Sequence, residues 1–342
     1  MCYLSGQASG DAAFDLLFGR VVSCGKLAET FPVFLSDNPN YPYFGAAKTA
    51  KYRESIFVGY RYYDAANKNV LFPFGFGLSY STFTYRNLSL SRTEIVDSDT
   101  ILVTMDVENT GEFDASEIVQ IYVQPPESRI FKAKKELKGF AKIALKKGET
   151  GRISINLDKR SFAYFNTNIH DWHVESGVYS ILAGASSRDI RLSADIHVTS
   201  ASEGVVVPDY RQQAPAYYSL EGNNLAIPKQ QFEYVYGAKM PAVPTAKKGS
   251  YHLNSTLSEL AGSFVGRILI KKIHQRFEAL YADDPIPDVI RMMNAMFADM
   301  PLRALVNFSG GELSFDALDG LILMMNGHLF RGYISFSKGG RK

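Results

Sequence analysis

Residues 101–157 constrain the fold of this chain more than any other stretch, because apolar and polar side chains alternate along them. The alternation has a period of two over residues 101–107 and again over 117–123, as in strands that bury one face. Asn109-Thr110-Gly111 lies between these two runs and favours a tight reversal, since Asn and Gly tolerate a left-handed backbone. The pattern predicts antiparallel strands joined by turns.

Further strands are expected at similar spacing. Pro125-Pro126 ends the second run, because proline cannot donate a hydrogen bond to a sheet ladder. Residues 146–149 are a lysine-rich turn between two later strands. The later strands are expected over residues 137–145, 152–157, 178–183 and 190–198. Short alternating strands with turn signals between them indicate an antiparallel β-sandwich, which we place at residues 71–199.

Composition excludes several classes of function. An apolar share of 46% and a charged share of 21% describe an ordinary globular protein. A formal net charge of +2 gives no electrostatic case for nucleic acid as a partner. The densest basic run, residues 132–138, is interpreted as a solvated turn between strands and not as a polyanion site. Since no apolar run approaches the roughly 20 residues of a membrane span, we expect no membrane partner.

The number and spacing of the cysteine and histidine residues argue against a metal site. Cys2 and Cys24 lack the spacing of a zinc site or a disulfide scaffold, and they suit a reducing compartment. The first residues lack the basic and then apolar pattern of a secretory signal, so a cytoplasmic location is expected. His170 and His173 are close in sequence without further ligands nearby. We therefore expect no metal site and no cofactor.

Residues 1–35 are interpreted as a piece of an α/β layer. We expect the end of a buried strand at residues 1–4 and a short helix over 11–18, with Gly19 suited to its C-terminal cap. One strand and one helix cannot bury their own apolar faces, so this segment should present apolar surface that the rest of the layer would cover. The residues expected to do so are Phe14, Leu17, Phe18 and Leu27.

Two irregular segments flank the sandwich. Residues 36–70 are rich in Asn, Pro, Tyr and Gly and are interpreted as a long ordered connector. Residues 200–255 contain Pro208, Pro215, Pro228, Pro241 and Pro244. Because prolines break regular elements, we expect an extended segment that lies across another surface.

Residues 256–342 have a helical period and are interpreted as a small α-helical tail. Thr256-Leu-Ser-Glu259 is a capping box at the start of the first helix. Its expected apolar stripe is Leu257, Leu260, Phe264, Ile268, Ile273, Phe277 and Leu280. A second helix is expected from Asp284-Pro285 to Pro301 and a third over residues 314–326. The many methionines suit either a partner surface or a bundle core, and both stay open.

Several motifs, in the expected order, resemble the fibronectin type III-like domain that ends glycoside hydrolase family 3 enzymes, mostly β-glucosidases and β-xylosidases. The motifs are Val107-Glu-Asn-Thr-Gly111, Glu117-Ile-Val-Gln-Ile-Tyr-Val123, Lys135-Glu-Leu-Lys-Gly-Phe140 and Gly184-Ala-Ser-Ser-Arg-Asp-Ile190. The expected fold class is therefore mainly β with α. A fibronectin type III-like (immunoglobulin-like) β-sandwich is preceded by a partial α/β layer and followed by a small helical tail.

The resemblance extends to both sides of the sandwich. Residues 15–19 and 25–32 look like the last unit of the family's α/β sandwich domain, with Cys24 in the place of a serine that family members usually carry. Residues 52–64 resemble the family's linker, and 72–80 its entry into the β domain. Residues 301–311 are similar, less closely, to C-terminal extensions of some bacterial members.

The resemblance implies chemistry that we do not expect within this chain. Retaining glycosidases need two carboxyl groups about 5 Å apart. In the resembled family the nucleophile is an aspartate on a (β/α)8 barrel and the acid/base is a glutamate on the α/β sandwich. A barrel takes about 250 residues, far more than precede the connector. We therefore expect both groups to lie outside the chain, and we name no catalytic or substrate-binding residue.

The carboxylates within the chain have structural interpretations. Asp11, Asp15 and Glu29 look like helix and loop-end residues. Glu54 is the one that merits attention, because it lies between a cation and an apolar run. Pairing with Arg53, Arg61 or Lys51 would hold it ionised and structural, which we favour over a substrate contact.

Two classes of function are carried forward. In the first, the chain is the C-terminal portion of a β-glucosidase-like enzyme. It would be inactive alone, its partner would be the missing barrel and α/β sandwich portion, and the complete enzyme would act on β-glucoside-type carbohydrate. In the second, the chain is a stand-alone β-sandwich binding or assembly module, which needs a self-sufficient N-terminus and an exposed aromatic platform. Trp172, expected in a turn before Gly177, is predicted to pack under a loop and not to stack on a sugar. A homo-oligomer stays open.

Overall fold

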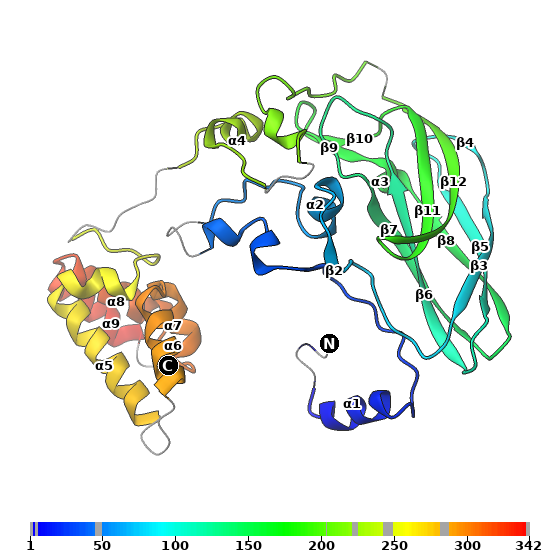
Figure 1. The fold of residues 1–342 in the computed structure, drawn as a ribbon. Coiled ribbons are helices and arrows are strands. Elements are labelled where there is room, and N and C mark those ends of the chain that lie inside the picture. The colour runs from blue at the N-terminus through cyan, green and yellow to red at the C-terminus, as the bar shows by residue number, and fades with distance from the viewer. Residues whose placement is uncertain are drawn as a thin grey trace. The chain divides into compact units, whose positions relative to one another are not determined.

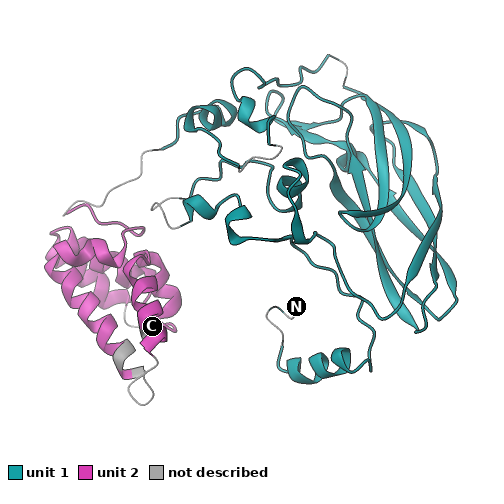
Figure 2. Ribbon diagram, in the orientation of Figure 1, with its two compact units in different colours: residues 1–241 teal, residues 242–342 magenta. Residues whose placement is uncertain are grey.

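The computed structural model describes residues 3, 6–44, 50–202, 204–220, 225–241, 249–280 and 287–339. The chain forms two compact units, residues 1–241 and 242–342, each with its own apolar core (Figure 2). The finer division into five segments stays a prediction.

The β-sandwich of the first unit has two sheets (Figure 1). One has the strand order β4-β12-β11-β6-β7 and the other β3-β5-β8. All pairs are antiparallel except β12 with β4. The strands are β3 Phe83–Leu90, β4 Glu94–Val96, β5 Ile101–Asn109, β6 Ala115–Gln124, β7 Glu136–Leu145, β8 Thr150–Leu157, β11 Gly177–Ser186 and β12 Asp189–Thr199. The predicted strands and the fold class are confirmed.

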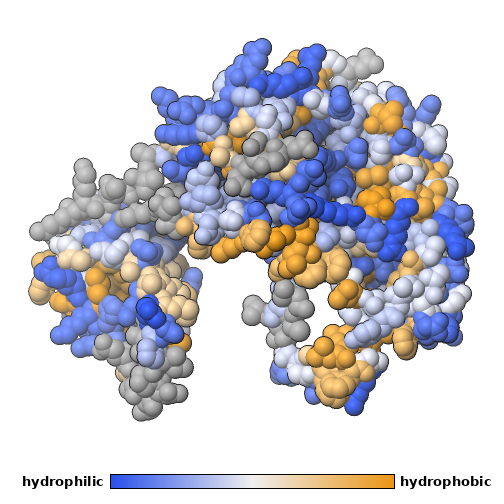
Figure 3. Space-filling model, in the orientation of Figure 1, coloured by the Kyte–Doolittle hydropathy of each residue, from blue (hydrophilic) through white to orange (hydrophobic). Residues whose placement is uncertain are grey.

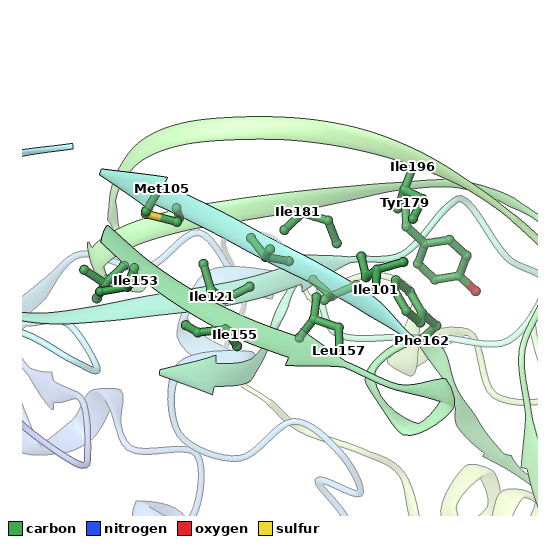
Figure 4. Packing of buried hydrophobic residues seen from close by; sticks show 14 of the residues in the cluster. Ile101, Met105, Ile121, Ile153, Ile155, Leu157, Phe162, Tyr179, Ile181 and Ile196 are labelled. Carbon is green, nitrogen blue, oxygen red and sulfur yellow. The ribbon is translucent and has the colours of Figure 1, made fainter. Parts of the chain in front are cut away.

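The sandwich core lies between the two sheets (Figure 4). Alternate residues of β5 are buried, and Ile101 and Val107 are fully inaccessible. They meet the inward face of β6, where Ile121 is also fully buried. Gly148 adopts φ +74° in the turn between β7 and β8, a conformation that glycine takes without strain. The period of two in β5 therefore has the predicted cause, which is a core on one side of the strand.

The outer face of β6 is also buried, because the connector packs on it. Gln120 donates from Nε2 to the carbonyl of Gly75 at 3.0 Å and accepts from the Tyr122 hydroxyl at 2.6 Å. The Tyr60 ring lies edge-on to the Tyr122 ring, with centroids 6.1 Å apart. Tyr60 begins a short helix, α2 Tyr60–Ala65, which the sequence analysis did not predict. The connector is thus an ordered layer on the sandwich.

The N-terminal segment contains α1 Ser9–Leu17, which confirms the predicted helix, and Gly19 follows its C-cap with φ +71°. The two-residue strand β1 Phe31–Pro32 pairs with β2 Val70–Phe72. The strand predicted at residues 1–4 lies outside the described residues. The segment is thus held to the unit by this strand pair, and the Tyr80 hydroxyl also donates to the Leu16 carbonyl of α1 at 2.8 Å.

Residues 204–220 and 225–236, which we name the strap, pack against the connector, as expected for this part of the predicted segment 200–255. Ala214, Tyr217, Leu220, Leu225 and Ile227 share a buried cluster with residues of the connector. The expectation that prolines prevent regular structure here is wrong. Helix α4 Lys229–Tyr236 begins directly after Pro228 and ends at Gly237, which has φ +77°. Both residues suit helix ends, because proline is tolerated before a first turn and glycine adopts the left-handed cap.

The second unit is a helical bundle. Its elements are the 3₁₀ helix η4 Leu257–Gly262 and helices α5 Phe264–Leu280, α6 Pro287–Ala298, α7 Leu302–Phe308, α8 Phe315–Met325 and α9 Leu329–Gly339. The predicted third helix is confirmed as α8, where Ser314 accepts from the Ala317 N–H at 3.1 Å. Helices α7 and α9 were not predicted. The predicted start at Asp284-Pro285 lies outside the described residues.

The predicted stripe of the first helix is partly wrong. The capping box at Thr256 exists, but it starts η4, and Ser263 is extended before α5 begins. Because the helix restarts there, the apolar phase shifts. Phe264 and Ile268 are 70% and 44% exposed, whereas Val265, Leu269, Ile270 and Ile273 pack against the core. The side chains of Phe277 and Leu280 lie outside the described residues.

Candidate functional site

The N-terminal helix exposes large apolar side chains next to a groove. Leu17 and Phe18 are 76% and 70% exposed, and Phe14 is 42% exposed. Figure 3 shows this apolar surface over α1. A groove of about 630 Å³ runs between the helix and residues 72–80, and Leu16, Leu27 and Phe76 are among its lining residues. Leu27, predicted to be exposed, is half-buried in it. An apolar helix face beside an apolar groove is a surface for another protein layer.

The same segment is fixed to the sandwich by a buried ion pair. Lys26 Nζ lies 2.9 Å from Glu117 Oε1, and the side chains are 14% and 7% exposed. The Tyr85 hydroxyl donates to the same carboxylate oxygen at 2.9 Å. Burial and the charge of Glu117 raise the pKa of Tyr85 well above its ordinary range, so this phenol stays a donor. Next to Lys26, Leu27 donates its backbone N–H to the Phe76 carbonyl and accepts from the Gly75 N–H, both at 2.8 Å. The apolar face is therefore carried on a rigid base.

A second buried carboxylate joins the connector to the sandwich. Asp64 accepts from Lys135 Nζ and from Arg188 Nε, both at 2.9 Å. Arg188 also donates to the Tyr63 carbonyl at 3.1 Å. Each of its two oxygens therefore already contacts a cation, and the side chain is only 7% exposed, so Asp64 is packed between the connector and the sandwich. The sequence analysis did not anticipate either ion pair.

Glu54, the carboxylate singled out from the sequence, is 4% exposed. Within the described residues its predicted pairing is wrong: Arg61 binds Glu136 at 3.0 Å, and Arg53 donates to the Ile227 carbonyl at 3.3 Å. Asn40 Nδ2 lies 3.5 Å from Glu54 Oε1. Burial, with the charge of Glu54 as the next cause, raises the pKa of Tyr217 to about 12. Glu54 therefore lies under the strap, out of reach of a substrate.

The basic run at residues 132–138 is not the solvated turn that was predicted. Lys132 pairs with Glu175, and the two side chains are 13% and 15% exposed. Burial lowers the pKa of Lys132, while the hydrogen bond to Glu175 opposes that shift. Lys135 holds Asp64 as described above. Lys132 and Lys135 therefore join this loop to other segments, whereas Lys134 is exposed as expected.

Trp172 lies in the short strand β10 Asp171–His173 and not in a turn, and it pairs with Phe165 of β9 Tyr164–Asn166. One face of its ring is covered by the Arg160 guanidinium, whose central carbon lies 3.4 Å from the ring centroid. Its other contacts are with the sandwich core. The ring is thus covered on one face and packs against the sandwich core, which favours the packing role expected.

The described residues were compared with the requirements of a metal site and of a membrane-spanning helix. Among them, no three His, Cys, Asp or Glu side chains are grouped so as to hold a metal ion. In the same residues, none of the helices combines the length and the apolar character of a membrane span.

Parts of this chain are similar to known protein families and to individual known proteins. Residues 1–80 match the glycosyl hydrolase family 3 C-terminal domain, and residues 117–187 match the fibronectin type III-like domain. The chain is 39% identical over 326 residues to the thermostable beta-glucosidase B of Acetivibrio thermocellus, covering 95% of this chain and 37% of that protein. It is 42% identical over 247 residues to an exo-alpha-(1->6)-L-arabinopyranosidase of Bifidobacterium breve, covering 71% and 30%.

Solved structures agree with these matches. The GH3 beta-glucosidase of Bifidobacterium adolescentis is similar with a TM-score of 0.55 and 37% identity, over 68% of this chain and 33% of that one. The beta-glucosidase of Kluyveromyces marxianus in complex with glucose gives a TM-score of 0.52 at 41% identity, over 56% and 22%. The chain thus spans about a third of the length of the curated relatives it matches.

Proposed function

This chain corresponds to the C-terminal part of a family 3 glycoside hydrolase, and from that premise we propose that it is a non-catalytic portion of a retaining β-glucosidase-like enzyme. Its role is to complete the α/β layer with residues 6–35 and to attach that layer to the sandwich. The substrate of the complete enzyme is then a β-glucoside-type carbohydrate. We also propose that the enzyme is cytoplasmic.

The observation that carries the proposal is the uncovered apolar face of α1 on a rigid base. A helix with Phe14, Leu17 and Phe18 outward would be covered in a finished layer. The match of residues 1–80 to the family 3 C-terminal domain supports the proposal, because α1 lies within the matched residues. The Lys26–Glu117 ion pair would then transmit the position of that layer to the sandwich.

The buried carboxylates favour a non-catalytic role. Retaining hydrolysis needs a nucleophile and an acid/base about 5 Å apart and open to the sugar. Asp64 and Glu117 are each occupied by a cation, and Asp97 lies 3.3 Å from the Lys159 ammonium and accepts from the Ala201 N–H at 3.1 Å. These groups hold segments together and are not placed to attack a glycosidic bond.

The test is an assay of the purified chain on aryl β-glucosides, alone and after mixing with a barrel-containing family 3 portion. We expect no turnover from the chain alone and turnover from the mixture. A matched control uses Leu17→Asp with Phe18→Asp, which should prevent the recovery because it places charge on the docking face. Turnover by the chain alone, abolished by changing one of its own carboxylates, would refute the proposal.

One observation favours the second candidate, a stand-alone binding module. The connector exposes several aromatic rings, as a sugar platform would. They are Tyr41, Tyr43, Phe44 and Tyr52, with 50% to 90% of each exposed. Titration of the chain with cello-oligosaccharides, followed by tyrosine fluorescence, separates the two candidates. Saturable binding that Tyr52→Ala weakens would favour the module, and its absence would favour the enzyme portion.

A further inference from the structure

A cavity of about 510 Å³ lies between the N-terminal segment and the sandwich. Its wall comes from residues 24–26, from residues within 73–83 and from the β11–β12 turn at residues 185–191, and Glu117 of β6 completes it. A hollow of this size where several segments meet is typical of small-molecule sites, which occupy about 300–1,000 Å³. The cavity is therefore a candidate binding site of the first unit.

Each cation in the wall of this cavity already has a carboxylate partner. The ion pairs are Lys26–Glu117, Arg188–Asp64 and Arg191–Asp189, each with 2.9 Å between nitrogen and oxygen. Asp64 also binds Lys135, which does not line the cavity. An anionic or zwitterionic ligand would have to break one of these pairs, and a charge that stays buried without its partner is costly. The described residues of the wall thus offer no free cation, and the ligand that fits them is electrically neutral.

The buried carboxylate of Glu117 has one oxygen to spare. Its Oε1 accepts from Lys26 Nζ and from the Tyr85 hydroxyl, both at 2.9 Å. No hydrogen bond within the described part of the chain engages Oε2. The Glu117 side chain is only 7% exposed and lines the cavity, so the part of it that remains accessible faces the cavity. Since buried polar atoms ordinarily have a hydrogen-bond partner, an unused acceptor at this position favours a ligand that donates.

Hydroxyl groups of the wall supply donors. Ser186 is 3% exposed, and its Oγ accepts from the backbone N–H groups of Arg188 and Asp189 at 3.3 and 3.0 Å. Ser79 Oγ accepts from the Ser81 N–H at 3.2 Å. Because a hydroxyl group donates as well as accepts, both serines keep an O–H that the described contacts leave unused. The wall therefore presents donors and acceptors together.

We propose that this cavity binds a neutral, polyhydroxylated molecule of monosaccharide size. Each hydroxyl group of such a molecule both donates and accepts, so it can donate to Oε2 of Glu117 and accept from the serine O–H groups without disturbing an ion pair. Phe76 and Phe83, both half-buried, add an apolar side against which the C–H groups of a sugar ring can pack. The site does not depend on the proposed glycosidase role, because all of its residues belong to this chain.

Titration calorimetry of the full chain tests the binding, with glucose, xylose and myo-inositol as the probes. The titration extends into the millimolar range, because small ligands with few contacts bind weakly. We expect saturable binding of at least one probe at one site per chain, and Ser79→Phe should weaken it at least about tenfold because the ring fills the cavity. Ser89→Phe, at an exposed position of β3, is the matched control and should leave the binding unchanged. Thermal melting checks that both variants are folded.

Protection of a thiol group locates the bound probe. Cys24 is half-buried and lines the cavity. In a chain with Cys2→Ser, the probe that binds should slow the alkylation of Cys24 by iodoacetamide in proportion to the occupied fraction. The control chain has Cys2→Ser, Cys24→Ser and Lys142→Cys, which places its thiol group at an exposed position of β7. Its rate of alkylation should not change.

Three results would overturn the proposal. One is the absence of saturable binding by all three probes. Another is binding that leaves the alkylation of Cys24 unchanged, or that Tyr52→Ala abolishes and Ser79→Phe does not, since the sugar would then lie on the connector. The third is protection of Cys24 by inorganic phosphate or glycine and not by the neutral probes, which would assign the cavity to a charged ligand.

Discussion

The ammonium group of Lys26 lies 2.9 Å from Oε1 of Glu117, although the two residues are 91 positions apart. The pair joins the N-terminal segment to β6, at the same carboxylate that accepts from Tyr85. Both side chains are nearly inaccessible to water. This contact fixes where the apolar face of α1 is presented.

Removing the cation should therefore destabilise the first unit. We expect Lys26→Met to lower the free energy of unfolding by about 3 kcal/mol, because it leaves the Glu117 carboxylate buried beside Tyr85 without its counter-charge. Adding Glu117→Gln should recover part of the loss. Urea unfolding of both single variants and the double variant measures the coupling. Strictly additive losses would show that the two groups do not interact.

The sandwich should lose stability on mild acidification through His173, which is 4% exposed. Burial lowers its pKa from 6.5, and nearby Lys132 and Lys159 lower it further against the opposing charges of Glu175 and Asp97. Since the unfolded chain takes up the proton first, stability should fall as the pH drops below about 6.5. It should level off below the folded pKa. Melting temperature against pH measures this, and His173→Gln should flatten the slope. An unchanged slope in that variant, or an equal effect of His197→Gln on the exposed side of β12, would contradict the assignment.

The sequence predicted most of the strands well because they bury one face in the sandwich core. Residues 101–107 and 152–157 alternate cleanly for that reason. Helix α4 was missed although Pro228 and Gly237 mark both its ends, because the prolines of the segment were weighed as breakers and not as caps. The stripe of α5 was misplaced because Ser263 interrupts the helical phase, which periodicity alone does not reveal.

The site was less predictable than the fold. Glu54 was chosen for its neighbours in sequence, yet the groups that surround it come from Asn40 and from the strap. The sequence pattern did not predict the ion pair between Lys26 and Glu117. A polar residue in a strand, such as Glu117, is ordinarily exposed to solvent. Contacts over such separations depend on how the segments pack, and the sequence pattern carries no direct information on that.

The strap should depend on one aromatic residue of the sandwich. Phe131 is 9% exposed and stacks on Tyr217 with centroids 4.5 Å apart. We expect Phe131→Ala to cost about 3–5 kcal/mol in the free energy of unfolding, since it removes a buried ring. Phe140→Ala, at a position that is 67% exposed, should change it by less than about 0.5 kcal/mol. Equal effects in denaturant titrations would mean that Phe131 does not anchor the strap.

Glycine at position 332 should be needed for its small size. Ala normally stabilises an exposed helix position relative to Gly by about 0.5–1 kcal/mol. At Gly332 we expect the opposite sign, a loss of about 1–3 kcal/mol, because the added methyl group meets the Gly320 carbonyl at 2.5 Å. Thermal unfolding followed by circular dichroism at the helical band reports this. A gain in stability would show that α8 and α9 are not in backbone contact.

Hydrogen exchange of residues 6–35 tests the central claim most directly, measured in the chain alone and with a barrel-containing family 3 portion added. A nine-residue helix whose apolar face is uncovered has little to stabilise it. We predict fast exchange throughout α1 in the chain alone, slower exchange around Lys26, and strong protection of α1 once the partner is added. Strong protection of α1 in the isolated monomer, unchanged by the partner, would contradict the claim that this face docks the rest of the enzyme.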